Sequence, residues 1–275
     1  MIPTDVKTLE RFFTNRGIDQ SKLEFYNDPA FMKAGRGEIG FLEYYGAWVR
    51  MRPRTAEYDV RVRKLVPRIA TLLAAEIEKD GQLGACIDGS MILMKILEEE
   101  GIWCYGVKGA LSIVAPRLPD PTYFWLYDLE SAAGHVWIAA PPLEITTLKL
   151  QPYSRGEKDL VPLTIVAETA RPFTPEPHDY CSSDVLMAAH QQNGLLPLDM
   201  HFRLYPGLRR PAEYLPSLEV DVRTAKIRYA RGGITVSDGP SLASIVSRKW
   251  NGRLAVEVYN GKPGIADLKE ADGQC

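Results

Sequence analysis

The spacing of apolar residues predicts two helices in the first eighty positions. Apolar side chains recur at intervals of three and four over residues 4–15, as expected for a short helix with one buried face. A longer stripe of the same period covers residues 55–80, where Thr55 can cap the start. Pro67 interrupts this second stripe and predicts a kink or a restart of the helix. Residues 16–54 carry no clear period.

A third helix is predicted by the stretch "GACIDGSMILMKILEEEGI", residues 84–102. Its apolar residues cover most of the helix circumference, which is typical of a helix buried in the middle of a fold. Gly101 ends the helix. The sequence therefore places a thiol, Cys86, in the first turn of a buried helix.

The residues that follow alternate and are rich in aromatic and β-branched side chains, which predicts strands. We expect them over 102–116, over 122–129 and, broken by Pro141-Pro142, in two pieces over 134–151. Helices followed by strands without intervening helices indicate an α+β fold with an antiparallel sheet.

Residues 152–275 differ in composition from the preceding part of the chain, because prolines are frequent up to Pro211. A helix is predicted from Ser182 or Ser183 to Asn193, a hairpin around Gly232-Gly233, a helix over 241–252 and a last strand over 253–259. The chain contains no internal repeat.

Composition narrows the class of protein. The 275 residues are 45% hydrophobic and 25% charged with a net charge of −2, so nothing indicates a nucleic-acid or membrane partner. No apolar run is long enough to span a bilayer and no leader pattern opens the chain, so we expect a soluble cytoplasmic protein. The segment Arg203–Arg231 carries seven basic and three acidic residues, which we interpret as a solvated face.

Four cysteines are widely spaced: Cys86, Cys104, Cys181 and Cys275. Without a CxxC pair, a structural zinc site is not expected, and we expect no metal and no organic cofactor. Each cysteine is interpreted as a free thiol, and most free thiols are small core residues.

Cys86 has a second interpretation, because the partial positive charge at a helix start stabilises a thiolate. A thiol nucleophile also needs a base and a group that orients the base. His135 opens a predicted strand and Glu144 lies on the next one. This order of cysteine, histidine and carboxylate fits a catalytic triad.

The segments "GACIDGSMILMKILEEEGI", "WCYGVKG" and "GHVWIAAPPLEITTLKLQ" together resemble the transglutaminase-like branch of the papain-like cysteine protease and acyltransferase superfamily. The resemblance implies a central helix packed on an antiparallel sheet over residues 55–151. Residues 1–54 would form a helical and loop segment packed on this core. Residues 152–275 would be a C-terminal α/β extension of unknown role.

The resemblance also implies roles. Cys86 would attack an acyl carbonyl of a peptide or protein, His135 would act as base and acid, and Glu144 would orient the imidazole. The Cys86 backbone N–H is one natural oxyanion donor, and Gln82 is a second candidate by its chemistry alone. Trp137, on the same face as His135, would line the substrate cleft. If water cleaves the thioester formed on Cys86, the protein would be a peptidase or amidase. If an amine cleaves it, the protein would be a transferase.

Two features favour a catalytically inactive binding module on the same scaffold. Glu144 stands where the family usually has aspartate, and strand spacing places it on the order of 13 Å from His135 in a tight hairpin. Thr146 is then the alternative orienting group. Asp88, two residues after Cys86, would repel a thiolate. The oligomeric state is not predicted.

Overall fold

The computed structural model describes residues 2–38, 40–80, 86–126, 134–148, 161–193 and 215–237, together with two short strands near the C-terminus. The helices are α1 (Val6–Thr14), η1 (Phe25–Asn27), α2 (Pro29–Gly35), α3 (Leu42–Met51), α4 (Ala56–Asp80), α5 (Cys86–Glu99), α6 (Pro177–Tyr180) and α7 (Ser183–Asn193).

One antiparallel sheet of eight strands organises the fold. Its strands are β1 (Tyr105–Val114), β2 (Thr122–Phe124), β3 (His135–Ala140), β4 (Leu143–Leu148), β5 (Thr164–Ala167), β6 (Arg171–Phe173), β7 (Ser217–Val222) and β8 (Ala225–Thr235). They run in the order β5-β4-β3-β1-β8-β7-β6, and β2 pairs with β1. A separate pair is formed by β9 (Lys249–Trp250) and β10 (Arg253–Leu254). The α+β class with an antiparallel sheet is therefore confirmed.

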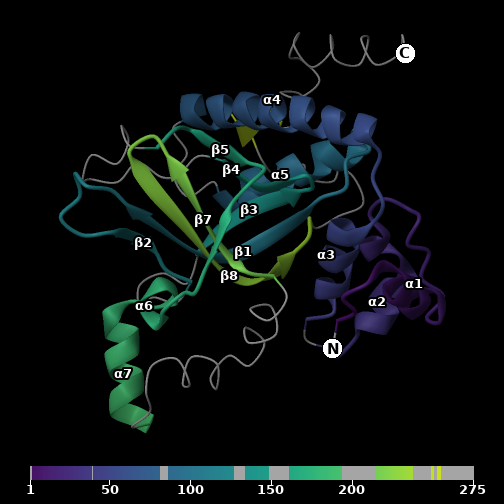
Figure 1. The fold of residues 1–275 in the computed structure, drawn as a ribbon, viewed down its shortest axis with the longest axis horizontal. Helices are drawn as coiled ribbons and strands as arrows, with labels where there is room; N and C mark the ends of the chain where they lie inside the picture. The colour runs from purple at the N-terminus through teal and green to yellow at the C-terminus, as the bar shows by residue number, and fades with distance from the viewer. Residues whose placement is uncertain are drawn as a thin grey trace.

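Helices cover the sheet unevenly. Figure 1 shows α4 lying along one side of the sheet with α5 beneath it, and these two helices pack on β3, β4 and each other. The N-terminal helices α1, α2 and α3 gather at one end, where α3 contacts β1 and β8. Four of the strands after residue 152, β5, β6, β7 and β8, lie in the same sheet as β1, β3 and β4, so part of the C-terminal region extends the sheet that carries the predicted core.

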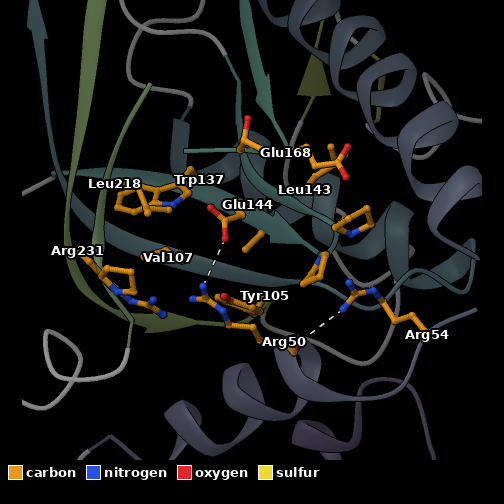
Figure 2. Close-up of a pocket in the computed structure, with 15 residues that line it drawn as sticks. Arg50, Arg54, Tyr105, Val107, Trp137, Leu143, Glu144, Glu168, Leu218 and Arg231 are labelled. Atoms are coloured by element: carbon orange, nitrogen blue, oxygen red, sulfur yellow. Dashed lines mark hydrogen bonds and ion pairs between the residues drawn. The ribbon is translucent and has the colours of Figure 1, made fainter. Parts of the chain in front are cut away.

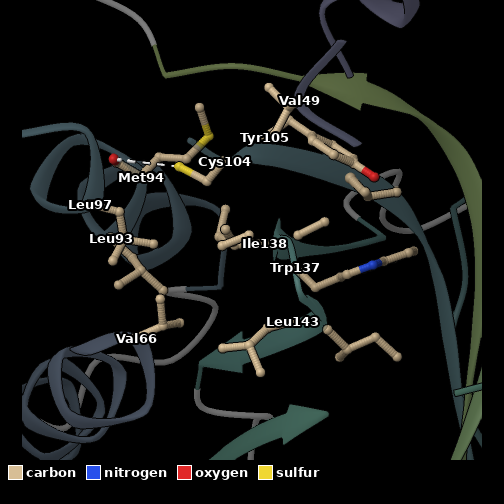
Figure 3. Close-up of a cluster of buried hydrophobic side chains, with 14 of the residues drawn as sticks. Val49, Val66, Leu93, Met94, Leu97, Cys104, Tyr105, Trp137, Ile138 and Leu143 are labelled. Atoms are coloured by element: carbon tan, nitrogen blue, oxygen red, sulfur yellow. Dashed lines mark hydrogen bonds between the residues drawn. The ribbon is translucent and has the colours of Figure 1, made fainter. Parts of the chain in front are cut away.

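Strand alternation separates the two faces of β3, because successive side chains point to opposite sides. Figure 3 shows Ile138 pointing toward Leu93 and Leu97 of α5, while its neighbour Trp137 points away from that helix. The Trp137 ring instead packs against Tyr229 of β8, with centroids 5.0 Å apart. One face of β3 therefore belongs to the helix-covered core and the other to the opposite side of the sheet.

Several predicted elements occur as expected. The helices over 4–15, 84–101 and 183–193 are α1, α5 and α7, and the Pro141-Pro142 step does separate β3 from β4. The helix over 55–80 is α4, but it passes through Pro67 as one element. The cap of α1 is Asp5, whose Oδ1 accepts the Thr8 N–H at 2.9 Å.

Two predictions for the C-terminal part are wrong. The expected hairpin around Gly232-Gly233 does not form, because β8 runs through both glycines and pairs with β1 along its length. The turn lies earlier, at Arg223 and Thr224 between β7 and β8. The helix predicted over 241–252 is also wrong at its end, where Lys249–Trp250 is a strand; residues 238–248 lie outside the described residues.

Candidate functional site

Cys86 begins α5, as the sequence predicts, but its thiol is buried. The Val136 N–H is directed at the sulfur, and the Ser90 hydroxyl, one turn further along α5, donates to the Val136 carbonyl at 3.1 Å. Burial raises the pKa of Cys86, and Asp88 adds to the increase, while the hydrogen-bond donors only partly oppose it. The thiol is therefore protonated at neutral pH.

His135 begins β3 and is only 1% exposed. It shares the face of Trp137 by strand alternation, and its ring lies 6.1 Å from that of Phe124 on β2. Its Nε2 has no hydrogen-bond partner within the described part of the chain. Burial alone lowers the pKa of His135 to about 3, so the imidazole is neutral at neutral pH.

Glu144 contacts neither of these groups in the described hydrogen bonds; its Oε1 pairs with Arg50 Nη2 of α3 at 3.4 Å. Thr146, the alternative orienting residue, pairs with Ile138, whose side chain faces α5 rather than the His135 side. Gln82 lies outside the described residues. The structure therefore places Cys86 and His135 in adjacent elements but does not join them and Glu144 into a hydrogen-bonded triad.

The sheet instead carries a pocket of about 340 Å³ on the face opposite α5. Figure 2 shows Trp137 and Glu144 on one side of it and Arg50 on the other, with the dashed line of the ion pair between Glu144 and Arg50. Its lining comes from β1, β3, β4, β7 and β8, from α3, and from the segments after α3 and β5. Trp137, predicted to line a substrate cleft, thus lines a pocket away from Cys86.

Three arginines converge on this pocket: Arg50, Arg54 and Arg231. Arg54 Nε is 2.8 Å from Asp59 Oδ1. Arg231 is only 4% exposed, and its Nε and Nη2 lack partners among the described residues. Burial lowers the pKa of Arg231, and the carboxylate of Glu43 partly opposes this shift. Each arginine therefore has a carboxylate in its surroundings.

These arginines were not predicted as functional residues. Arg50 and Arg54 lie in the stretch without a clear period, and Arg231 belongs to the basic segment that we interpreted as a solvated face. The burial of Arg231 contradicts that interpretation at this position. The alternation of β8 offers a signal, since Arg231 follows the buried Ile227 and Tyr229 at two-residue steps and therefore lies on the same face of the strand.

Scans against protein-family models, curated proteins and solved structures found no significant match. Among the described residues, no group of three or more histidine, cysteine or acidic side chains is placed to hold a metal ion. In the same part of the chain, none of the helices combines the length and the apolar character needed to cross a bilayer.

Proposed function

We propose that this chain is a non-catalytic binding module that takes a small ligand in the pocket of the sheet. The observation that carries the proposal is the pocket itself. Its volume of about 340 Å³ lies in the range of small-molecule sites, and it combines an apolar wall with a few convergent charged groups.

The protonation states of Cys86 and His135 support a module without thiol chemistry. A thiol whose pKa is raised by burial is a poor nucleophile at neutral pH, because the thiolate is the attacking species. An imidazole with a pKa of about 3, whose Nε2 has no partner among the described residues, does not stabilise a thiolate as an ion pair. Both groups fit a role in core packing.

Site-resolved alkylation tests this proposal. The folded protein is treated with iodoacetamide at neutral pH and modification of each cysteine is followed by mass spectrometry. We expect Cys86 to react at a rate close to those of Cys104 and Cys181, which are also buried, and all three to react fast in denaturant. Reaction of Cys86 about a hundredfold faster than the other two in the folded protein would contradict the proposal.

Thiol-dependent acyl transfer on a peptide or protein is the second candidate function. The observation in its favour is that the first residue of α5 contacts β3 at Val136, next to His135. This candidate requires Cys86→Ala to abolish peptidase, amidase or amine-transfer activity while the melting temperature stays nearly unchanged. Ligand binding that survives Cys86→Ala, with no turnover by the wild type, favours the binding module.

A further inference from the structure

The pocket contains an ion pair that is open to a ligand. Arg50 Nη2 and Glu144 Oε1 make one contact at 3.4 Å, and the two side chains are 37% and 33% exposed. A guanidinium and a carboxylate can form two parallel hydrogen bonds, so this single long contact leaves capacity on both groups.

Two of the neighbouring charged side chains, Arg54 and Glu168, have ion-pair partners outside the pocket. Arg54 pairs with Asp59, Glu168 pairs with Arg63, and Arg231 lies in the field of Glu43. Arg231 is buried, and its Nε and Nη2 have no partner among the described residues. The half-exposed charges that a ligand can reach without breaking the Arg54 or Glu168 ion pair are therefore Arg50 and Glu144, one of each sign.

The Arg50–Glu144 pair selects among ligand charges. An anion that binds Arg50 is repelled by Glu144, and a cation that binds Glu144 is repelled by Arg50 and its neighbouring arginines. A ligand that carries both charges on neighbouring atoms avoids both penalties. Its carboxylate contacts Arg50 and its ammonium contacts Glu144, which gives a ring of four alternating charges beside the existing pair.

We propose that the pocket binds a zwitterion of the α-amino acid type with an apolar or aromatic side chain. In such a ligand the carboxylate and ammonium are separated by one carbon, which matches the short Arg50–Glu144 separation. The side chain lies against the wall formed by Trp137, Leu218 and Val107, where an aromatic ring gains from both burial and ring contact. This inference rests on the proposed binding function of the same pocket.

Three matched probes test the inference by isothermal titration of the full chain. L-phenylalanine carries both charges, 3-phenylpropionate lacks the ammonium, and phenethylamine lacks the carboxylate. We expect L-phenylalanine to bind at least about tenfold more tightly than either analogue. Equal binding of 3-phenylpropionate would overturn the zwitterion but retain the pocket as a binding site. Failure of all three to bind would overturn this inference, whereas the proposed function is contradicted separately by fast alkylation of Cys86 in the folded protein.

Charge-neutral variants assign the contacts. We expect Glu144→Gln to weaken the binding of L-phenylalanine by about tenfold without weakening the binding of 3-phenylpropionate. Arg50→Gln should weaken the binding of both probes. Arg68→Gln, on an exposed position of α4 away from the pocket, is the matched control and should change neither. Thermal melts of each variant show whether it is folded. Folded Glu144→Gln protein that binds L-phenylalanine as the wild type does would overturn the assignment.

Discussion

At the scale of single residues, His135 illustrates how burial sets the chemistry of a side chain. The residue starts β3 as the sequence predicts, but the imidazole lies on the face of Trp137, among side chains that give it no charge partner in the described part of the chain. Its pKa of about 3 follows from burial alone. The order of cysteine, histidine and carboxylate in the sequence does not establish which side chains are in contact. The carboxylate predicted to orient His135, Glu144, instead pairs with Arg50, 94 positions earlier in the chain.

The depressed pKa of His135 predicts a pH dependence of stability. An unfolded histidine titrates near 6.5, so below about pH 6.5 the unfolded state binds a proton that the folded state does not. The free energy of unfolding should therefore fall with decreasing pH, by up to about 1.4 kcal/mol per pH unit, until the folded pKa of about 3 is reached.

Urea denaturation of the wild type and of His135→Leu at pH values from about 7 to about 5 measures this slope. In His135→Leu, the free energy of unfolding should fall less steeply with decreasing pH, because the histidine that takes up a proton on unfolding is absent. A wild type that gains stability as the pH falls through about 6.5, with the gain lost in His135→Leu, would indicate a paired imidazolium and contradict the assignment.

At the scale of elements, apolar spacing predicted α1, α4, α5 and the strands around Pro141-Pro142, because these elements bury a continuous stripe or face. The Gly-Gly turn signal, in contrast, gives the wrong prediction at Gly232-Gly233, where β8 continues. A Cβ on Gly232 would lie 2.7 Å from the Lys108 carbonyl oxygen, so glycine permits the close approach of β8 to β1 there. Such cross-strand contacts are not visible in a local pattern.

Gly109 of β1 provides a test of this close packing. A Cβ at this position would lie 2.3 Å from the Ala230 carbonyl oxygen and 2.8 Å from the Trp137 ring. We expect Gly109→Ala to lower the free energy of unfolding by about 3 kcal/mol, because backbone of β8 and the ring both have to move.

Gly233→Ala in β8 is the matched control for Gly109→Ala, since its nearest atom is Glu43 Oε1 at 3.8 Å. It should change stability by no more than about 1 kcal/mol. Similar free energies of unfolding for the two variants in urea would show that the approach of β8 and Trp137 to Gly109 is not tight.

At the scale of the whole molecule, the N-terminal segment belongs to the same hydrophobic core as the sheet. Buried residues of α1, α3, α4, α5 and the strands form one continuous cluster. A polar connection adds to it, since the fully buried Lys95 of α5 pairs with Glu24 at 2.7 Å and with Glu98 at 3.0 Å. Tyr26 donates its hydroxyl hydrogen to Glu98 at 2.7 Å. We therefore expect residues 1–54 and the sheet to unfold together.

Lys95→Met tests this connection. The substitution leaves Glu98 buried without its cation, which should lower the free energy of unfolding by about 3–5 kcal/mol. The double variant Lys95→Met/Glu98→Leu should recover part of the loss, because the fully buried carboxylate is removed and only the partly exposed Glu24 is left without its cation. A loss below about 1 kcal/mol in Lys95→Met would show that Lys95 and its contact with Glu24 do not stabilise the packing of α5 on the N-terminal segment.

Fluorine NMR of protein labelled with 5-fluorotryptophan tests most directly whether the sheet pocket is the ligand site. The chain has five tryptophans, and Trp137→Phe identifies the signal of the one that lines the pocket. Titration with L-phenylalanine, 3-phenylpropionate and phenethylamine should shift the Trp137 signal while that of Trp48, buried among the N-terminal helices, stays in place. A Trp137 signal unmoved by all three probes at saturating concentration would contradict the account.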